Sequence, residues 1–197
     1  KNQTEFAYGE DFVWLPVETE LEAKNLIRKV YADEVKQNGV ENVQILTPRR
    51  KGDGVSVNGM NEELHEMMNP ARKGQLEMKA AGHTFRAGDK IIQNKNKDGI
   101  SNGDSGFIKA VYLDSDGVKK TEIAFGSRIV EYDEEQMEMV EHAYIQTVHK
   151  SQGSEYPVVI LPWLMVFRLM LKRNILYTAI TRAKVKLIII GQKRAIE

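Results

Sequence analysis

Two apolar runs near the end of the chain constrain its fold more than any other feature. Residues 157–161 read Pro-Val-Val-Ile-Leu, and a second run extends from Val185 to Ile190. Neither run alternates apolar with polar side chains, as a strand with one face in water would. Continuous apolar strands are typical of the centre of a parallel sheet covered by helices on both faces. The chain is therefore predicted to contain a parallel α/β domain.

The first 70 residues have the strand–helix order that such a sheet needs. Thr19 and Glu22 have capping-box spacing, in which each side chain bonds the backbone N–H of the other, and this predicts a helix start. Asn38-Gly39 supplies its left-handed end. The apolar stripe of this helix consists of Ala23, Leu26, Ile27, Val30, Tyr31 and Val35. The other elements expected here are strand 11–17, strand 43–47 and a helix over about 58–69.

The pattern changes between residues 85 and 140, where short β runs alternate with glycine turns. Asp116-Gly117 is a strong hairpin signal, and Thr121, Ile123 and Phe125 alternate toward one face. The expected strands are 90–93, 106–112, 120–125 and 128–132. We therefore expect an α/β domain built from residues 1–84 and 141–197, interrupted by a small β-barrel at 85–140.

Composition limits the location and partners of the chain. Its 28 basic and 28 acidic side chains cancel, so a nucleic acid would have to be held by a local basic patch. The absence of cysteine excludes thiolate chemistry and fits a reducing compartment. No apolar run approaches the length that crosses a bilayer. A cytoplasmic protein with no membrane partner is expected.

A polar segment, Thr-Val-His-Lys-Ser-Gln-Gly-Ser-Glu at 147–155, directly precedes the first apolar run. Loops beyond the carboxyl ends of parallel strands form ligand sites, and this segment is interpreted as such a loop. Its hydroxyls and amides suit phosphate or ribose, Gly153 permits close backbone approach, and Glu155 can accept hydrogen bonds from sugar hydroxyls. The alternative is a polar turn that only caps a helix.

A second segment, Arg-Asn-Ile-Leu-Tyr-Thr-Ala-Ile-Thr-Arg-Ala-Lys at 173–184, predicts a helix over about 174–184 with two distinct faces. The apolar face holds Ile175, Leu176, Ala179, Ile180 and Ala183, and the polar face holds Asn174, Tyr177, Thr178, Thr181 and Arg182. An arginine on a rigid helix can stabilise charge on a transferred phosphoryl group. The alternative is a solvated face on which Arg182 forms a surface ion pair.

Together these two segments resemble motifs V and VI of superfamily 1 DNA helicases, in particular the RecD-like group that includes the alpha subunit of exodeoxyribonuclease V. Residues 43–52, Val-Gln-Ile-Leu-Thr-Pro-Arg-Arg-Lys-Gly, resemble the motif IV region of the same group. Residues 85–106 resemble the start of its inserted barrel of the Src-homology-3 type. The resemblance covers nearly the whole chain in the order of the family.

The resemblance implies a second RecA-like domain with an SH3-like insertion, taken from an ATP-driven motor that moves 5′ to 3′ along single-stranded DNA. Arg182 matches the arginine finger, and Gly153 and Glu155 match the nucleotide contacts. Gln152 would link the nucleotide to the DNA, with Tyr177 and Thr178 supporting the finger or simply packing the helix.

Further positions are implied as DNA contacts. Thr147 and His149 match the part of motif V that faces DNA. Arg49 lies in a basic run that contacts phosphate or forms a plain loop. Asn94 and Lys95 lie in a barrel loop that touches the DNA backbone or is only a charged hairpin tip.

Some parts of such a motor are not found in this sequence. No G-x-x-x-x-G-K-[ST] motif occurs, and Asp133-Glu134-Glu135-Gln136 lacks the apolar strand that a magnesium-binding box needs, so it is interpreted as a solvated turn. The chain is thus expected to begin after an N-terminal RecA-like domain that would complete the site. ATP and Mg²⁺ are expected in the full-length parent, none tightly bound here, and this segment alone is expected to be inactive.

Partners and rival functions remain open from the sequence. The family name adds the other subunits of exodeoxyribonuclease V as candidate partners. The four histidines, at 65, 83, 142 and 149, have no metal-ligand spacing, so no metal site is expected. The alternatives are a non-catalytic nucleic-acid-binding or protein-binding module, or the helicase half of a conjugative relaxase.

Overall fold

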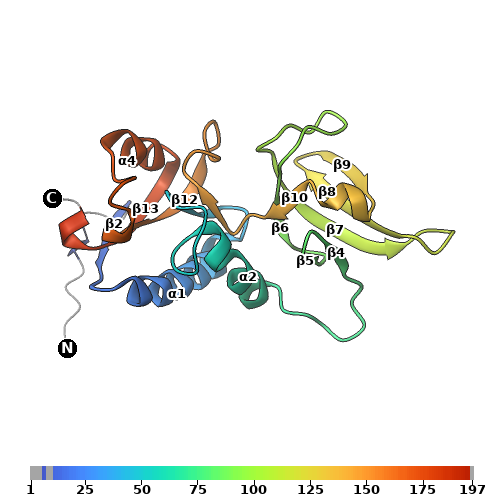
Figure 1. Cartoon of the computed structure of the whole chain (residues 1–197), viewed down its shortest axis with the longest axis horizontal. Coiled ribbons are helices and arrows are strands. Elements are labelled where there is room, and N and C mark those ends of the chain that lie inside the picture. Colours follow the sequence, from blue (N-terminus) through green and yellow to red (C-terminus); the bar gives the residue numbers. More distant parts are fainter. Residues whose placement is uncertain (1–5, 8–10, 196–197) are drawn as a thin grey trace. The chain divides into compact units, whose positions relative to one another are not determined.

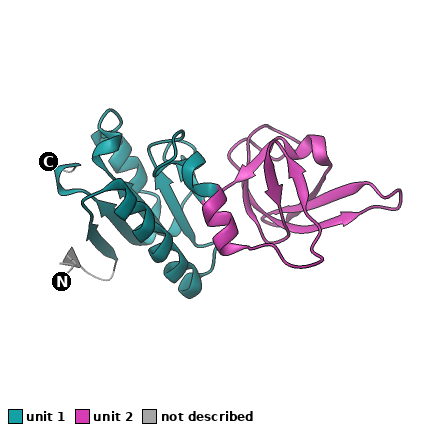
Figure 2. Ribbon diagram, turned by 60° about the horizontal axis from the view of Figure 1, so that its bottom comes forward, with its two compact units in different colours: residues 1–61, 145–197 teal, residues 62–144 magenta. Residues whose placement is uncertain are grey.

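The structure, a computed structural model, describes residues 6–7 and 11–195. It divides into two compact units, one made of residues 1–61 and 145–197 and the other of residues 62–144 (Figure 2). The second unit therefore includes residues on both sides of the barrel that the sequence predicted at 85–140.

The first unit is built on a six-stranded sheet with the order β1-β2-β13-β12-β3-β11. Its strands are β1 (Phe6–Ala7), β2 (Phe12–Pro16), β3 (Val43–Thr47), β11 (Ile145–Thr147), β12 (Tyr156–Trp163) and β13 (Ala183–Gly191). All pairs are parallel except β1 with β2. The two apolar runs are β12 and β13, both at inner positions, which confirms the predicted parallel α/β fold.

Helices cover both faces of this sheet: α1 (Glu20–Asn38) lies on one side and α4 (Arg173–Ile180) on the other (Figure 1). Ile27 and Tyr31 of α1 are fully buried, whereas Ile175 and Ala179 of α4 join the core formed by β12 and β13. Two short 3₁₀ turns, η1 (Met165–Phe167) and η2 (Lys193–Ala195), complete the unit.

Helix α1 ends at Asn38 with a positive φ at Gly39, as predicted, but two other predicted helix ends differ in part from expectation. The Thr19 hydroxyl accepts from the Glu22 N–H as predicted, but the Glu22 carboxylate accepts from Glu18 instead of Thr19. The predicted helix 174–184 ends at Ile180, because Ala183 already pairs with Tyr156 at the start of β13. Pairing along a buried neighbour fixes these residues as strand despite their helical periodicity.

The second unit contains a five-stranded antiparallel sheet with the order β10-β6-β7-β8-β9. Its strands are β6 (Lys90–Gln93), β7 (Ser105–Leu113), β8 (Lys119–Phe125), β9 (Arg128–Tyr132) and β10 (Val140–His142). A separate two-stranded sheet pairs β4 (Met78–Ala80) with β5 (His83–Phe85). Thr121, Ile123 and Phe125 are all buried, and Gly117 has the positive φ of the predicted hairpin turn. The inserted barrel-type sheet is therefore confirmed.

Two helices and one hairpin extend this picture. Helix α2 (Val57–Met68) begins one residue before the predicted start, and Met60 and Leu64 are fully buried. Asp133 caps the four-residue helix α3 (Glu134–Met137), so the predicted solvated turn is one helical turn with exposed glutamates. The β4–β5 hairpin was not predicted.

Among the described residues, no helix is long and apolar enough to cross a membrane.

Candidate functional site

The polar segment begins where edge strand β11 ends. The Thr147 hydroxyl accepts a hydrogen bond from the Lys150 N–H at 3.2 Å, and the Thr147 carbonyl accepts from the Ser151 N–H at 3.2 Å. The Ser151 hydroxyl is buried and donates to the Val148 carbonyl at 2.8 Å. Thr147 therefore organises the turn with its own side chain, whereas His149 and Gln152 are exposed to solvent.

Gly153 gives the segment a backbone conformation that other residues rarely adopt. Its φ is +86°, and a Cβ at this position would meet nothing within 4 Å. The glycine is needed for the left-handed backbone and not for close packing.

Replacing Gly153 by alanine is expected to destabilise the first unit by about 1 kcal/mol, the typical strain of a left-handed alanine. Asparagine tolerates this region better, so Gly153→Asn is expected to cost less. Urea unfolding of both variants measures this difference. Equal losses for the two variants would mean that backbone strain is not the cause.

Arg182 follows α4 and packs against the end of the polar segment. Its guanidinium donates from Nη1 to the Ser154 carbonyl at 3.1 Å and from Nε to the Thr178 carbonyl at 3.2 Å. Its Nη2 donates to the Thr181 hydroxyl at 3.3 Å, and its own carbonyl accepts from the Tyr156 N–H at 2.8 Å. The structure thus brings the arginine and the end of the polar segment together. Thr178 supports the arginine through its backbone, whereas Tyr177 is 71% exposed.

Glu155, the other residue predicted at this edge, is held by a lysine. Its Oε2 lies 2.7 Å from Nζ of Lys184, and both side chains are more than half exposed. The hydrogen bond with Lys184, together with its charge, lowers the pKa of Glu155. Such an exposed pair is weak, so it can open when a sugar hydroxyl competes for the carboxylate.

The predicted residues lie at opposite ends of the parallel strands. Arg182 and Glu155 are at the amino ends of β13 and β12, whereas Thr147 follows the carboxyl end of β11. Strands rise about 3.3 Å per residue, so the two ends of β12 are on the order of 20 Å apart. The expectation that the whole segment lies beyond carboxyl ends is therefore wrong: it begins there at Thr147, and residues 148–155 lead to the amino ends of β12 and β13.

Arg49 follows the carboxyl end of β3 and is held by contacts with α1 and with its own loop. Its Nη1 lies 3.3 Å from Oε1 of Glu20, and its Nε donates to the Lys51 carbonyl at 2.8 Å. Oε1 of Glu20 also accepts from the Val55 N–H at 2.8 Å. This guanidinium therefore orders the loop, and a DNA phosphate would have to compete with Glu20.

Sequence reasoning missed a groove beside Arg49. A cavity of about 580 Å³ lies between residues 49–51 and the loop that follows β12. Val166 and Met170 line it and are partly exposed, and Leu169 is 83% exposed. The available signal was the apolar stretch 164–171, which continues past the end of its strand.

Asn94 and Lys95 lie in the second unit, in the loop after β6. The Asn94 N–H donates to the Met139 carbonyl at 2.7 Å, and the Gln93 side chain donates to the Lys95 carbonyl at 2.7 Å. The Lys95 side chain is exposed. Lys97, by contrast, lies over the Tyr132 ring, with Nζ 4.7 Å from its centroid. Of these loop lysines, Lys95 is thus the better placed to meet a phosphate.

Two family profiles match separate parts of this chain. A profile of the UvrD-like helicase C-terminal domain matches residues 142–190, and one of the ATP-dependent RecD-like DNA helicase SH3 domain matches residues 60–125. The ATP-dependent RecD2 DNA helicase of Deinococcus radiodurans is 33% identical over 168 residues, which is 84% of this chain. The chain spans only 22% of the length of that relative.

Solved structures support the fold alone, because their sequences are distant. Pif1 helicase from Bacteroides, in complex with ADP-AlF3 and single-stranded DNA, is 16% identical with a TM-score of 0.52, covering 88% of this chain and 49% of that one. Pif1 helicase from Candida albicans is 12% identical with a TM-score of 0.52, covering 90% and 56%.

The two profile matches and the RecD2 relative place this chain in the C-terminal region of superfamily 1 helicases. Within that class the chain belongs to the RecD-like family of ATP-dependent helicases, and it corresponds to the C-terminal helicase region with its SH3 domain.

Proposed function

We propose that this chain is the second RecA-like half of an ATP-driven DNA motor and that Arg182 is its arginine finger. One observation carries the proposal: the Arg182 guanidinium donates a hydrogen bond to the Ser154 carbonyl at 3.1 Å. This bond holds the proposed finger against the end of the motif V segment. Residues 1–84 and 141–197 would form the motor half, with the SH3-like insertion at 85–140.

The chemistry of Arg182 suits a phosphoryl group. A guanidinium has five N–H donors, and the three hydrogen bonds to Ser154, Thr178 and Thr181 leave two for phosphate oxygens. These bonds also fix its orientation before the nucleotide arrives. A preorganised cation stabilises the charge that develops in phosphoryl transfer without reorganisation during the reaction.

Segment 148–155 connects the proposed DNA contacts to the proposed nucleotide contacts. Thr147 and His149 would face DNA at one edge, and Gly153 and Glu155 would contact the nucleotide at the other. Gln152, which is exposed between them, would respond to both. Because residues 147 to 151 are joined by short-range hydrogen bonds, a shift at one end would move the other.

The remaining parts of the ATP site would come from a P-loop domain outside these residues. The donors assembled here are N–H and hydroxyl groups, which fit the phosphates of ATP. Mg²⁺ prefers carboxylate and water oxygens and would be held by the P-loop domain. Bound ATP supplies the free energy for movement, and the residues described here orient and sense it.

Single-stranded DNA is the proposed track, with movement from 5′ to 3′. Arg49, Asn94 and Lys95 would add phosphate contacts to those of motif V. The direction, and any partner subunits of the exodeoxyribonuclease V type, rest on family resemblance alone.

The isolated 197-residue chain is expected to show no DNA-stimulated ATP hydrolysis, because the phosphate cradle is not in its sequence. Phosphate release with and without single-stranded DNA tests this. Hydrolysis above background would contradict the half-site proposal. Tight, strongly salt-dependent DNA binding by the isolated chain would favour the non-catalytic binding module instead.

A further inference from the structure

Three of the four histidines lie together in the second unit. His65 is on α2, His83 on β5 and His142 on β10, and Glu62 and Asp89 lie beside them. Chain spacing gave no sign of this cluster, because its members come from separate elements of the fold. Three sets of three ligands are close enough to consider as metal sites: His65 with Asp89 and His142, Glu62 with His83 and His142, and Glu62 with His65 and Glu66. In the third set Glu66 is already paired with Arg86, whose Nη2 lies 2.7 Å from its Oε1.

The first set is a poor metal site. The rings of His65 and His142 are stacked, with centroids 4.1 Å apart and planes 25° from parallel. Imidazole lone pairs lie in the ring plane, so stacked rings cannot direct them at one ion. In addition, Nη1 of Arg86 lies 3.3 Å from Nε2 of His65 and would repel a cation.

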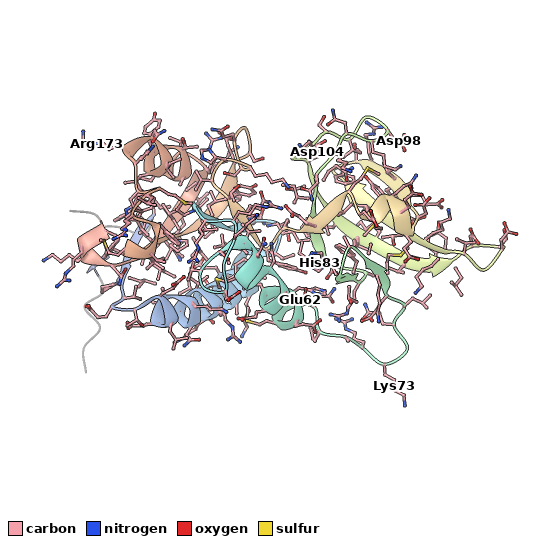
Figure 3. All side chains as sticks on the ribbon, in the orientation of Figure 1. Glu62, Lys73, His83, Asp98, Asp104 and Arg173 are labelled. Carbon is pink, nitrogen blue, oxygen red and sulfur yellow. The ribbon has the colours of Figure 1, made fainter. Side chains whose placement is uncertain are left out.

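The second set has better geometry. The His83 and His142 rings are 5.8 Å apart and inclined at 77°, so their lone pairs can converge. Nδ1 of His83 lies 3.8 Å from Oε2 of Glu62, and one ligand atom from each residue lies within 4.8 Å of the others. Figure 3 shows Glu62 on α2 beside His83 on β5. Modest side-chain movement would bring all three onto one ion.

His142 provides an independent sign of a ligand. Its side chain is 1% exposed, and neither Nδ1 nor Nε2 has a hydrogen-bond partner. An unsatisfied buried nitrogen is costly, typically about 1–3 kcal/mol. Its Nε2 faces Oδ2 of Asp89 at 3.4 Å. Metal-binding histidines almost always donate their second N–H to such a carboxylate, which fixes the ring for coordination.

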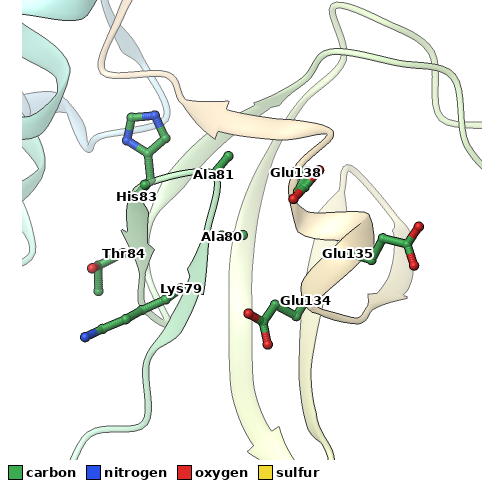
Figure 4. Close-up of a pocket in the computed structure, with 9 residues that line it drawn as sticks. Lys79, Ala80, Ala81, His83, Thr84, Glu134, Glu135 and Glu138 are labelled. Carbon is green, nitrogen blue, oxygen red and sulfur yellow. The ribbon is translucent and has the colours of Figure 1, made fainter.

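We propose that Glu62, His83 and His142 form a Zn²⁺ site in which Asp89 orients His142. Two imidazoles and a carboxylate are suitable zinc ligands, and a water would complete the tetrahedron. The His83 and Glu62 side chains are 44% and 55% exposed, so an ion can enter from solvent. His83 also lines a pocket of about 660 Å³ with the β4–β5 hairpin and α3 (Figure 4).

Such an ion would join three elements of the second unit. It would tie α2 and β5 to β10, the strand on which the chain leaves the barrel-type sheet. Its role would be structural, and the proposal does not depend on the motor function.

The test is Zn²⁺ binding to the EDTA-treated chain, measured by isothermal titration calorimetry, with Co²⁺ as a spectroscopic probe. One Zn²⁺ per chain is expected, with visible Co²⁺ bands of tetrahedral intensity. Mutating a residue that only supports a metal ligand typically weakens metal binding by about 10–100-fold. His83→Ala and Glu62→Gln remove ligands themselves, so we expect them to weaken Zn²⁺ binding by more than about 100-fold. Both side chains are substantially exposed, so these variants should fold.

His149→Ala is the matched control, because it removes an exposed histidine outside the cluster. It should bind Zn²⁺ as the unchanged chain does. The proposal is overturned if no Zn²⁺ binds at micromolar concentrations. It is also overturned if His83→Ala and Glu62→Gln bind like the unchanged chain, or if His149→Ala loses binding equally.

Discussion

Arg182→Ala in the complete helicase is expected to lower DNA-stimulated ATP hydrolysis by about a thousandfold or more, the usual contribution of an arginine finger. Single-stranded DNA binding should change little, because Arg182 lies at the amino edge of the sheet and Thr147 at the opposite edge. Steady-state hydrolysis at saturating DNA, together with DNA titration by fluorescence anisotropy, separates the two effects.

Two further variants show whether the guanidinium itself matters. Arg182→Lys keeps the charge but loses the planar fork, so it should recover only a small part of the rate. Arg28→Ala, on the exposed side of α1, removes a cation elsewhere and should leave hydrolysis unchanged. Hydrolysis by Arg182→Ala within a few-fold of the unchanged helicase would refute the finger assignment.

Asp89→Ala is expected to destabilise the second unit by about 3–5 kcal/mol, the usual result of removing one partner from a buried charged network. The Asp89 side chain is fully buried. Its oxygens accept from the Asn69 amide at 2.7 Å, the Arg86 N–H at 2.7 Å and the Tyr144 hydroxyl at 3.2 Å.

The same contacts keep Asp89 ionised. Burial alone would raise its pKa, but the nearby His142 imidazole and the hydrogen bonds from His65 and Asn69 outweigh burial and hold the pKa far below its usual value. Alanine would leave these donors without an acceptor in a dry environment.

Urea unfolding combined with hydrogen exchange at β6 and β10 locates the Asp89 effect. Glu135→Ala, which removes an exposed carboxylate from α3 in the same unit, should change stability by less than about 0.5 kcal/mol. An Asp89→Ala chain with unchanged exchange in β6 would show that Asp89 does not hold this unit together.

Local sequence patterns predicted the secondary structure correctly where the apolar pattern and the turn residues indicate the same element. The run 157–161 became inner strand β12, and Asp116-Gly117 became a hairpin. The helix predicted at 174–184 was too long, because periodicity cannot report that Ala183 pairs with a neighbouring strand. The β4–β5 hairpin was missed because its strands have only three residues each.

The sequence by itself determined a parallel α/β core with an antiparallel insertion, since apolar periodicity and turn residues act over a few neighbouring positions. Only the tertiary structure decided which distant residues meet. It placed Arg182 against Ser154 at one edge, Thr147 at the other, and three histidines in one cluster. These contacts depend on strand order and direction, which are set by how whole elements bury their faces against one another.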